Sequence, residues 1–220
     1  MGWNFCSGSS GILRRGSCSE DEREMIRSVW RQTYHHNICS ATEPTFQINI
    51  FINDQFHVEE TPQVIRLHAW ATELIRKYSG KSHFLHQMGF FLTTNQPTLG
   101  QEFHTDYHPK AETFFIPMVP ISTFTYNSTN PSAILTEDKH SEKDDLDMLE
   151  REGMDYMDIT KIISKEYTIL HSLKNNILRN TKNLTDYDMP MFFVYCTPDK
   201  EAKIKEIDTN SDKPTPKRKN

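Results

Sequence analysis

The sequence predicts a mainly β domain of the sandwich or barrel type, with a jelly roll among the candidate folds and helices flanking the sheet. Short segments rich in aromatic and β-branched residues recur along the chain, separated by clusters of turn residues. Two stretches in the N-terminal third instead have the apolar period of a helix. The 220 residues are enough to bury one substantial core, so a single main domain is expected.

Two helices are predicted ahead of most of the strands. The first begins at Ser19, which can cap it, and acidic residues in its first turn oppose the positive end of the helix dipole. The second follows Pro62, carries an apolar stripe of helical period and is closed by Gly80. We expect this apolar stripe to pack on the sheet.

The strands are predicted from alternation and from aromatic content. Residues 44–58 alternate phenylalanine and isoleucine with polar or less apolar residues, which is the period of a strand. Pro117 and Pro120 interrupt a later apolar run and favour an edge or a bulge over a central strand. The other predicted strand segments are HFLHQMGFFLTT, QEFHTDY, TFFIPMVPISTFTY, AIL, EYTILHS and PMFFVYCTP.

Composition divides the chain into four parts. Residues 1–20 are rich in glycine, serine and arginine and are predicted to be a flexible leader. Residues 21–200 are expected to form the single domain, with an acidic insertion near 136–158 that could cover one end of the sheet. Residues 201–220 are polar, contain proline and are predicted to be a disordered tail.

Charge and cysteine content exclude several classes of function. The net charge of −5 gives no general attraction to nucleic acid, so a small-molecule substrate or an accessible side chain is the expected partner. No window approaches the roughly 18 apolar residues that an integral membrane span needs. The four cysteines form no C-x-x-C pair, which favours reduced thiols in an intracellular, cytoplasmic protein. No oligomeric state is predicted.

Three potential metal ligands occur at alternate positions in His104-Thr105-Asp106-Tyr107-His108. Pro109 and the flanking residues disfavour a helix here, and in a strand alternate side chains point to one side. Residues two apart are then roughly 6.6 Å apart along the strand, and residues four apart are about 13 Å apart. His104 and Asp106 can therefore share one ion, whereas His108 is expected to lie outside its coordination sphere.

An imidazole nitrogen and a carboxylate oxygen suit non-haem Fe(II) when a second histidine completes a facial triad with open positions. The H-x-D pattern alone is common by chance. Its surroundings, however, resemble the iron-binding region of the Fe(II)- and 2-oxoglutarate-dependent dioxygenases, particularly the phytanoyl-CoA-hydroxylase-like branch. The matching text is TTNQPTLGQEFHTDYHP, followed by TFFIPMVPIS, NSTNPSAIL and finally NLTDYDMPMFFVYCTP. The resemblance covers residues from about 46 to 198.

The resemblance implies a double-stranded β-helix, which is a form of jelly roll, with His104 and Asp106 as two iron ligands. It also implies a distal histidine before the last strand. His171 is the only histidine after position 140 and fits that role by type and order. The family spacing would place the ligand a few residues later, nearer Asn175 or Asn176.

The family further implies a basic residue that clamps the far carboxylate of 2-oxoglutarate, usually arginine because a guanidinium can bind a carboxylate through two hydrogen bonds. Met189 occupies the position where that arginine is expected. We predict Arg179 as its replacement, with Lys174 and Lys182 as further candidates, and Tyr107 as a residue lining the cofactor pocket.

Two functions of different classes follow. The first is an Fe(II)- and 2-oxoglutarate-dependent dioxygenase that hydroxylates an unidentified substrate. The second is a non-catalytic jelly-roll protein that binds a partner or small ligand in the same cavity, and the departures at Met189 and His171 favour it. A cupin-like enzyme of another reaction type would need extra histidine ligands near His104, and strand geometry speaks against His108.

Overall fold

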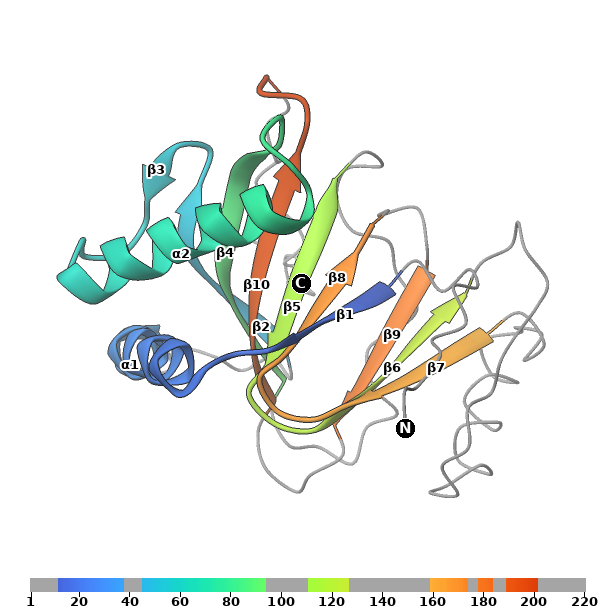
Figure 1. Cartoon of the computed structure of the whole chain (residues 1–220). Helices are drawn as coiled ribbons and strands as arrows, with labels where there is room; N and C mark the ends of the chain where they lie inside the picture. The colour runs from blue at the N-terminus through green and yellow to red at the C-terminus, as the bar shows by residue number, and fades with distance from the viewer. Residues whose placement is uncertain are drawn as a thin grey trace, which may run out of the picture.

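The computed structural model describes residues 12–37, 45–93, 111–126, 159–173, 178–183 and 189–201. Within these residues the strands form two antiparallel sheets, shown in Figure 1. The large sheet has the order β1-β8-β5-β10-β4-β2-β3, and the small sheet has the order β7-β6-β9. The elements are β1 (Ile12–Ser17), α1 (Glu20–Asn37), β2 (Thr45–Ile52), β3 (Gln55–Phe56), α2 (Pro62–Tyr78), β4 (Phe84–Thr93), β5 (Glu112–Pro117), β6 (Ile121–Tyr126), β7 (Ile159–Ser164), β8 (Thr168–Ser172), β9 (Leu178–Asn183) and β10 (Met189–Thr197).

After β4 the chain passes repeatedly between the two sheets. Strand β5 lies in the large sheet, β6 and β7 in the small sheet, β8 in the large sheet, β9 in the small sheet and β10 in the large sheet. This path is typical of a jelly roll, in which two sheets enclose one core. The prediction of a mainly β fold with flanking helices is confirmed.

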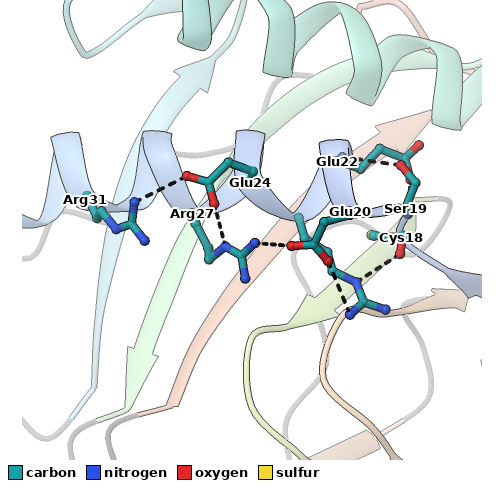
Figure 2. A network of polar contacts seen from close by, with 8 residues as sticks. Cys18, Ser19, Glu20, Glu22, Glu24, Arg27 and Arg31 are labelled. Carbon is teal, nitrogen blue, oxygen red and sulfur yellow. Dashed lines mark hydrogen bonds and ion pairs between the residues drawn. The ribbon is translucent and has the colours of Figure 1, made fainter.

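Helix α1 begins with a reciprocal capping arrangement, shown in Figure 2. The Ser19 backbone N–H donates to Oε2 of Glu22 at 2.6 Å, and the Glu22 N–H donates to the Ser19 hydroxyl at 3.3 Å. Two N–H groups that the helix itself cannot pair are thereby satisfied, and the predicted cap at Ser19 is confirmed. On the exposed side Glu24 pairs with Arg27 at 2.9 Å and with Arg31 at 3.3 Å. Such exposed ion pairs contribute little to stability.

Helix α2 lies across the large sheet (Figure 1). Thr61 caps it by accepting a hydrogen bond from the Val64 N–H at 3.4 Å, and Pro62 occupies the first turn, where its missing N–H needs no partner. Trp70 donates to Glu22 of α1 at 2.7 Å, which ties the two helices together. The buried side chains are Val64, Leu67, Ala71, Leu74 and Ile75. Neither described helix is long and apolar enough to cross a membrane.

The large sheet is buried on both faces. The helix face packs under α1 and α2 and includes Ile48, Ile50, Met88, Phe90, Phe114, Ile116, Ile169, Phe192, Val194 and Cys196. The inner face comprises Ile12, Phe115, Leu170, Met191, Phe193 and Tyr195 and packs with Ile121 of the small sheet. Successive residues of a strand point to opposite faces, so neighbours such as Ile169 and Leu170 belong to different layers.

Strand β1 lies within the predicted leader, residues 1–20. It pairs with β8 at the edge of the large sheet, where Ile12 is buried on the inner face. Tyr78 of α2 also donates to the Arg15 carbonyl at 3.0 Å. Residues 12–17 therefore depart from the predicted flexible leader, because pairing with an available strand edge overrides a polar, glycine-containing composition. The predicted insertion at 136–158 lies outside the described residues, as does almost all of the tail.

Two predicted strand segments are divided in the structure. The segment 44–58 turns back at Asn53 and Asp54, whose φ angles of 49° and 66° suit the tight turn of a two-residue hairpin. Pro117 ends β5, a central strand, and β6 starts at Ile121 in the other sheet. The prolines therefore mark a corner between sheets rather than the predicted edge or bulge. Strands β7 and β9 were not predicted from the sequence.

The two described cysteines are unreactive thiols. Cys18 and Cys196 are both buried and unpaired with another cysteine. Burial is the main cause that raises the pKa of each thiol to about 12, so both remain protonated at neutral pH. A thiol is a poor nucleophile and a poor metal ligand compared with a thiolate, so neither cysteine is a candidate for covalent catalysis.

Candidate functional site

The predicted site residues fall on different parts of the chain. His104, Asp106 and Tyr107 lie outside the described residues, so their roles stay predictions. Arg179 lies on β9, a strand that pairs with β6 in the small sheet. His171 lies on β8, within the described residues.

His171 is fully buried on the helix face of the large sheet. It is 0% exposed, and its ring stacks on Phe114 with the ring centres 4.0 Å apart and the planes 15° apart. Ile169, two residues earlier, packs in the core under the helices, whereas Leu170 lies on the inner face. The alternation of the strand therefore directs the His171 ring toward α2 rather than between the two sheets.

Both ring nitrogens of His171 are hydrogen-bonded to charged groups. Arg15 donates to Nδ1 from Nε at 3.1 Å and from Nη2 at 3.0 Å. A guanidinium can only donate, so Nδ1 carries no proton. In the neutral ring the proton is then on Nε2, which donates to Oε2 of Glu112 at 2.8 Å. Arg15 and Glu112 together select one tautomer of the neutral imidazole.

The Glu112 carboxylate also contacts two residues at and just after the C-terminus of α2. His83 Nε2 lies 3.4 Å from its Oε1, and Ser79, the C-cap of α2, hydrogen-bonds the same carboxylate. The Cys196 thiol in turn donates to Ser79 at 3.8 Å. Burial acts to raise the pKa of Glu112, but the hydrogen bonds from His171 and Ser79 outweigh it and hold the pKa below its usual value. Glu112 is therefore ionised at neutral pH.

These contacts limit the chemistry available to His171. A metal ion bound through Nδ1 would have to displace Arg15, and one bound through Nε2 would have to displace Glu112 and the ring proton. Across the described ranges, no set of three His, Cys, Asp or Glu side chains is arranged to hold a metal ion. In this arrangement His171 does not fit the role of third iron ligand without a rearrangement of its network.

Sequence reasoning did not identify the partners of His171. Glu112 could have been predicted to be partly buried, because it is a carboxylate at the start of the apolar run ETFFIP. It lies on the same side of the strand as Phe114 and Ile116. Arg15 could not have been predicted as a partner of His171 from the sequence, because its segment has the composition of a flexible leader. The pairing of β1 with β8 brings it to His171.

The metal-free protein is expected to lose stability as the pH falls below about 6.5. Burial lowers the pKa of His171, against the opposing effect of Glu112, and burial also lowers the pKa of His68. The unfolded chain therefore takes up protons first, so stability is lost from the ordinary pKa of 6.5 down through the folded-state pKa. Among the described residues, the charged or titratable groups that face His171 are Arg15, Glu112 and His83. The pKa of Glu112 is also lowered in the folded protein, so stability falls further below about pH 4.5, where the unfolded chain takes up a proton first.

Urea unfolding at about pH 7.5 and about pH 5.5 tests this expectation, with a lower midpoint at the acid pH. His171→Phe keeps an aromatic ring on Phe114 and removes the titration, so its midpoint should fall less over the same interval. Equal midpoints of the unmodified protein at the two pH values would contradict the assignment of a neutral, buried His171.

The comparisons with known proteins identify the fold. No family model and no curated protein matches the sequence. SnoN, a non-heme alpha ketoglutarate dependent epimerase from nogalamycin biosynthesis, is 13% identical with a TM-score of 0.58 over 86% of this chain and 78% of that chain. HygX from Streptomyces hygroscopicus, with nickel and 2-oxoglutarate bound, is 15% identical with a TM-score of 0.56 over 86% and 83%. AviO1 from Streptomyces viridochromogenes Tue57 is 9% identical with a TM-score of 0.52 over 86% and 90%. At these identities the likeness establishes that the chain has the jelly-roll fold of these proteins.

Proposed function

We propose that this protein is an Fe(II)- and 2-oxoglutarate-dependent dioxygenase that hydroxylates a small molecule or an accessible side chain. The observation that carries the proposal is the occurrence of a His104-x-Asp106 pair, in the chain between β4 and β5, within a jelly-roll fold. HygX binds nickel and 2-oxoglutarate, and SnoN binds Fe3+ and alpha ketoglutarate. Those two proteins support the choice of cofactors.

The residues have distinct roles in this proposal. His104 and Asp106 hold Fe(II) through one imidazole nitrogen and one carboxylate oxygen, a donor set that suits this ion. Arg179 binds the far carboxylate of 2-oxoglutarate, and Tyr107 lines its pocket. When bound, Fe(II) and 2-oxoglutarate supply the oxidising chemistry with O2. His171 can serve as the third ligand only after its bonds to Arg15 and Glu112 are exchanged for the metal.

A second function, a non-catalytic jelly-roll protein that binds a ligand in the same interior, is favoured by one observation. The two nitrogens of His171 are already used by Arg15 and Glu112, on the face of the sheet that packs against the helices. Met189, in the position where the family has its arginine, agrees with this alternative. The two functions differ in whether the protein consumes 2-oxoglutarate.

Replacing Asp106 with alanine is expected to weaken Fe(II) binding by more than about 100-fold, because even residues that only support a metal ligand contribute 10- to 100-fold. Anaerobic Fe(II) titration measures the affinity, and succinate formation from 2-oxoglutarate measures turnover. Asp21→Ala, at an exposed position in the first turn of α1, is the matched control and should leave both unchanged.

The outcomes separate the two functions. Succinate formation that depends on Asp106 supports the dioxygenase. Fe(II) binding without succinate formation supports the non-catalytic alternative. Protein that does not bind Fe(II), with Asp106→Ala indistinguishable from the unmodified chain, would refute the proposed metal site.

A further inference from the structure

Strand β1 covers the gap between one edge of the large sheet and one edge of the small sheet. Among the described strands, β1 pairs only with β8, and β7 is an edge of the small sheet. Nη2 of Arg14 on β1 donates to the Ile163 carbonyl of β7, so β1 bridges the two edges. In Figure 1, β1 (dark blue) runs along the outer side of β8. The interior of the jelly roll is therefore closed on this side by β1.

Few buried side chains hold β1 in place. Ile12 is 5% exposed and packs on the inner face, whereas Leu13, Arg14, Gly16 and Ser17 are exposed. Every residue of β8, the strand that β1 covers, is buried. An element that buries little apolar surface opens locally at a lower free energy than the core of the same domain. Detachment of β1 is therefore less costly than detachment of a central strand.

A bulge near the end of β1 supplies a pivot. The register of β1 against β8 shifts between Arg14 and Gly16, so Arg15 is an extra residue that bulges from the strand. Gly16 has a φ of 125°, a conformation that is easily adopted only by glycine. Just beyond it the chain is anchored, because Cys18 is buried under the helices and its N–H donates to the Tyr167 carbonyl at 2.9 Å. The strand can therefore swing about Gly16 while Cys18 stays in place.

The polar contacts of β1 can be exchanged for water when the strand detaches. Arg15 donates to Nδ1 of His171, and the Arg15 carbonyl accepts from the Tyr78 hydroxyl. The His171 ring is neutral, so detachment leaves an acceptor nitrogen on β8 and no unpaired charge. The hydrogen bond from Nε2 of His171 to Glu112 and the stacking of the ring on Phe114 do not involve β1. That part of the network is therefore kept when β1 leaves.

We propose that β1, residues 12–17, is a strap that detaches as a unit while the rest of the fold stays intact, and that its detachment opens the interior between β8 and β7. Detachment removes Ile12 from the inner core and uncovers Ser172, which lies opposite Ile12 on β8. Large side chains such as Phe115 and Leu170 fill the inner face here, so a molecule enters only after such a movement. Detachment itself does not depend on the proposed function, whereas the admission of a substrate by this route rests on it.

Hydrogen exchange of the metal-free protein at low urea concentrations, followed by mass spectrometry, tests the strap. Peptides that cover β1 are expected to exchange at least about tenfold faster than peptides that cover β10, after correction for intrinsic rates. The rate in β1 should hardly change with urea, because detachment exposes little surface, whereas the rate in β10 should rise steeply. Equal protection of the two strands, with the same dependence on urea, would overturn the proposal.

Two glycine variants separate detachment from global unfolding. Gly16→Ala strains only the docked strand, so exchange in β1 should accelerate by about fivefold or more. Gly80→Ala, at a similar φ of 104°, is strained whether β1 is docked or detached, so it should accelerate exchange in β10 and leave β1 unchanged. Unchanged exchange of β1 in Gly16→Ala, or equal acceleration by Gly80→Ala, would refute detachment as a unit. If Gly16→Ala does not fold, Arg14→Gln, which removes the bridge to Ile163, is judged in the same way.

Access to the interior has its own readout. Ser172→Cys places a thiol opposite Ile12, and its alkylation by iodoacetamide is followed on the peptide that contains it. Alkylation should be accelerated by Gly16→Ala and not by Gly80→Ala, in parallel with exchange in β1. Alkylation that follows Gly80→Ala instead would show that the thiol is reached only by global unfolding, and the strap would not open the interior. These measurements need neither iron nor turnover, so the strap and the proposed function can fail independently.

Discussion

Replacing His171 with alanine is expected to lower the free energy of unfolding of the metal-free protein by about 3 kcal/mol or more. The change removes a ring that is fully buried and stacked on Phe114. It also removes the partner that Arg15 and Glu112 share, which leaves two charged groups with unmet hydrogen bonds at the edge of the core. Loss of packing and loss of hydrogen bonds act in the same direction.

Urea unfolding in the presence of a chelator measures the effect, with His57→Ala, an exposed histidine after β3, as the control. The control should stay within about 0.5 kcal/mol of the unmodified protein, which is the usual range for exposed positions. His171→Ala tests the role of this residue directly. A histidine that served only as a metal ligand would leave the stability of the metal-free protein unchanged, and that result would contradict the buried network described above.

A second measurement connects this network to the proposed iron site. If His171 becomes the third ligand, Fe(II) must release it from Arg15 and Glu112, so Glu112→Gln, which weakens one of those bonds, should strengthen Fe(II) binding. If His171 stays in its network, Glu112→Gln should lower stability and leave Fe(II) affinity as it was. The same variant thus distinguishes a site completed by rearrangement from a site in which His171 takes no part.

The fold was largely predictable because its elements are encoded locally. The cap at Ser19, the helical stripe after Pro62 and the alternating strands depend on residues close in sequence, and the structure confirms them. Strand β1 was not predictable, because Ile12–Ser17 becomes a strand only when β8 provides its edge. The turn at Asn53 and Asp54 was overlooked, although Asn and Asp are residues that tolerate the left-handed backbone.

The candidate site was less predictable, for a physical reason. His171 could be selected by residue type, but the face of the sheet on which it lies follows from the register of β8 against β1 and β5. A shift of one residue would direct its ring into the interior. Its partners come from β1, β5 and the segment after α2, which are far apart in sequence. Gln47 and Asn49, by contrast, alternate with isoleucines and could have been recognised as a polar inner face.

Replacing Gly89 with alanine is expected to destabilise the protein by about 3 kcal/mol or more, at or beyond the upper end for overpacking a core. Gly89 lies on β4 between Asn49 of β2 and Phe193 of β10. A Cβ atom there would overlap the carbonyl oxygen of Ile48 and would lie 3.2 Å from the Phe193 ring. The backbone oxygen cannot turn aside as a flexible side chain could, so β2 and β4 would have to separate.

That separation has a consequence beyond stability, because Asn49 and Gln87 are hydrogen-bonded across the same pair of strands. Gly89→Ala should therefore lower the urea midpoint and break this hydrogen bond. Gly80→Ala is the control: its Cβ meets no atom within 4 Å, and its φ of 104° costs about 1–3 kcal/mol without disturbing the sheet. It should lose some stability and leave the pairing of β2 with β4 intact. If Gly89→Ala were as stable as the unmodified protein, the close approach of β2 to β4, and with it the hydrogen bond from Gln87 to Asn49, would be wrong.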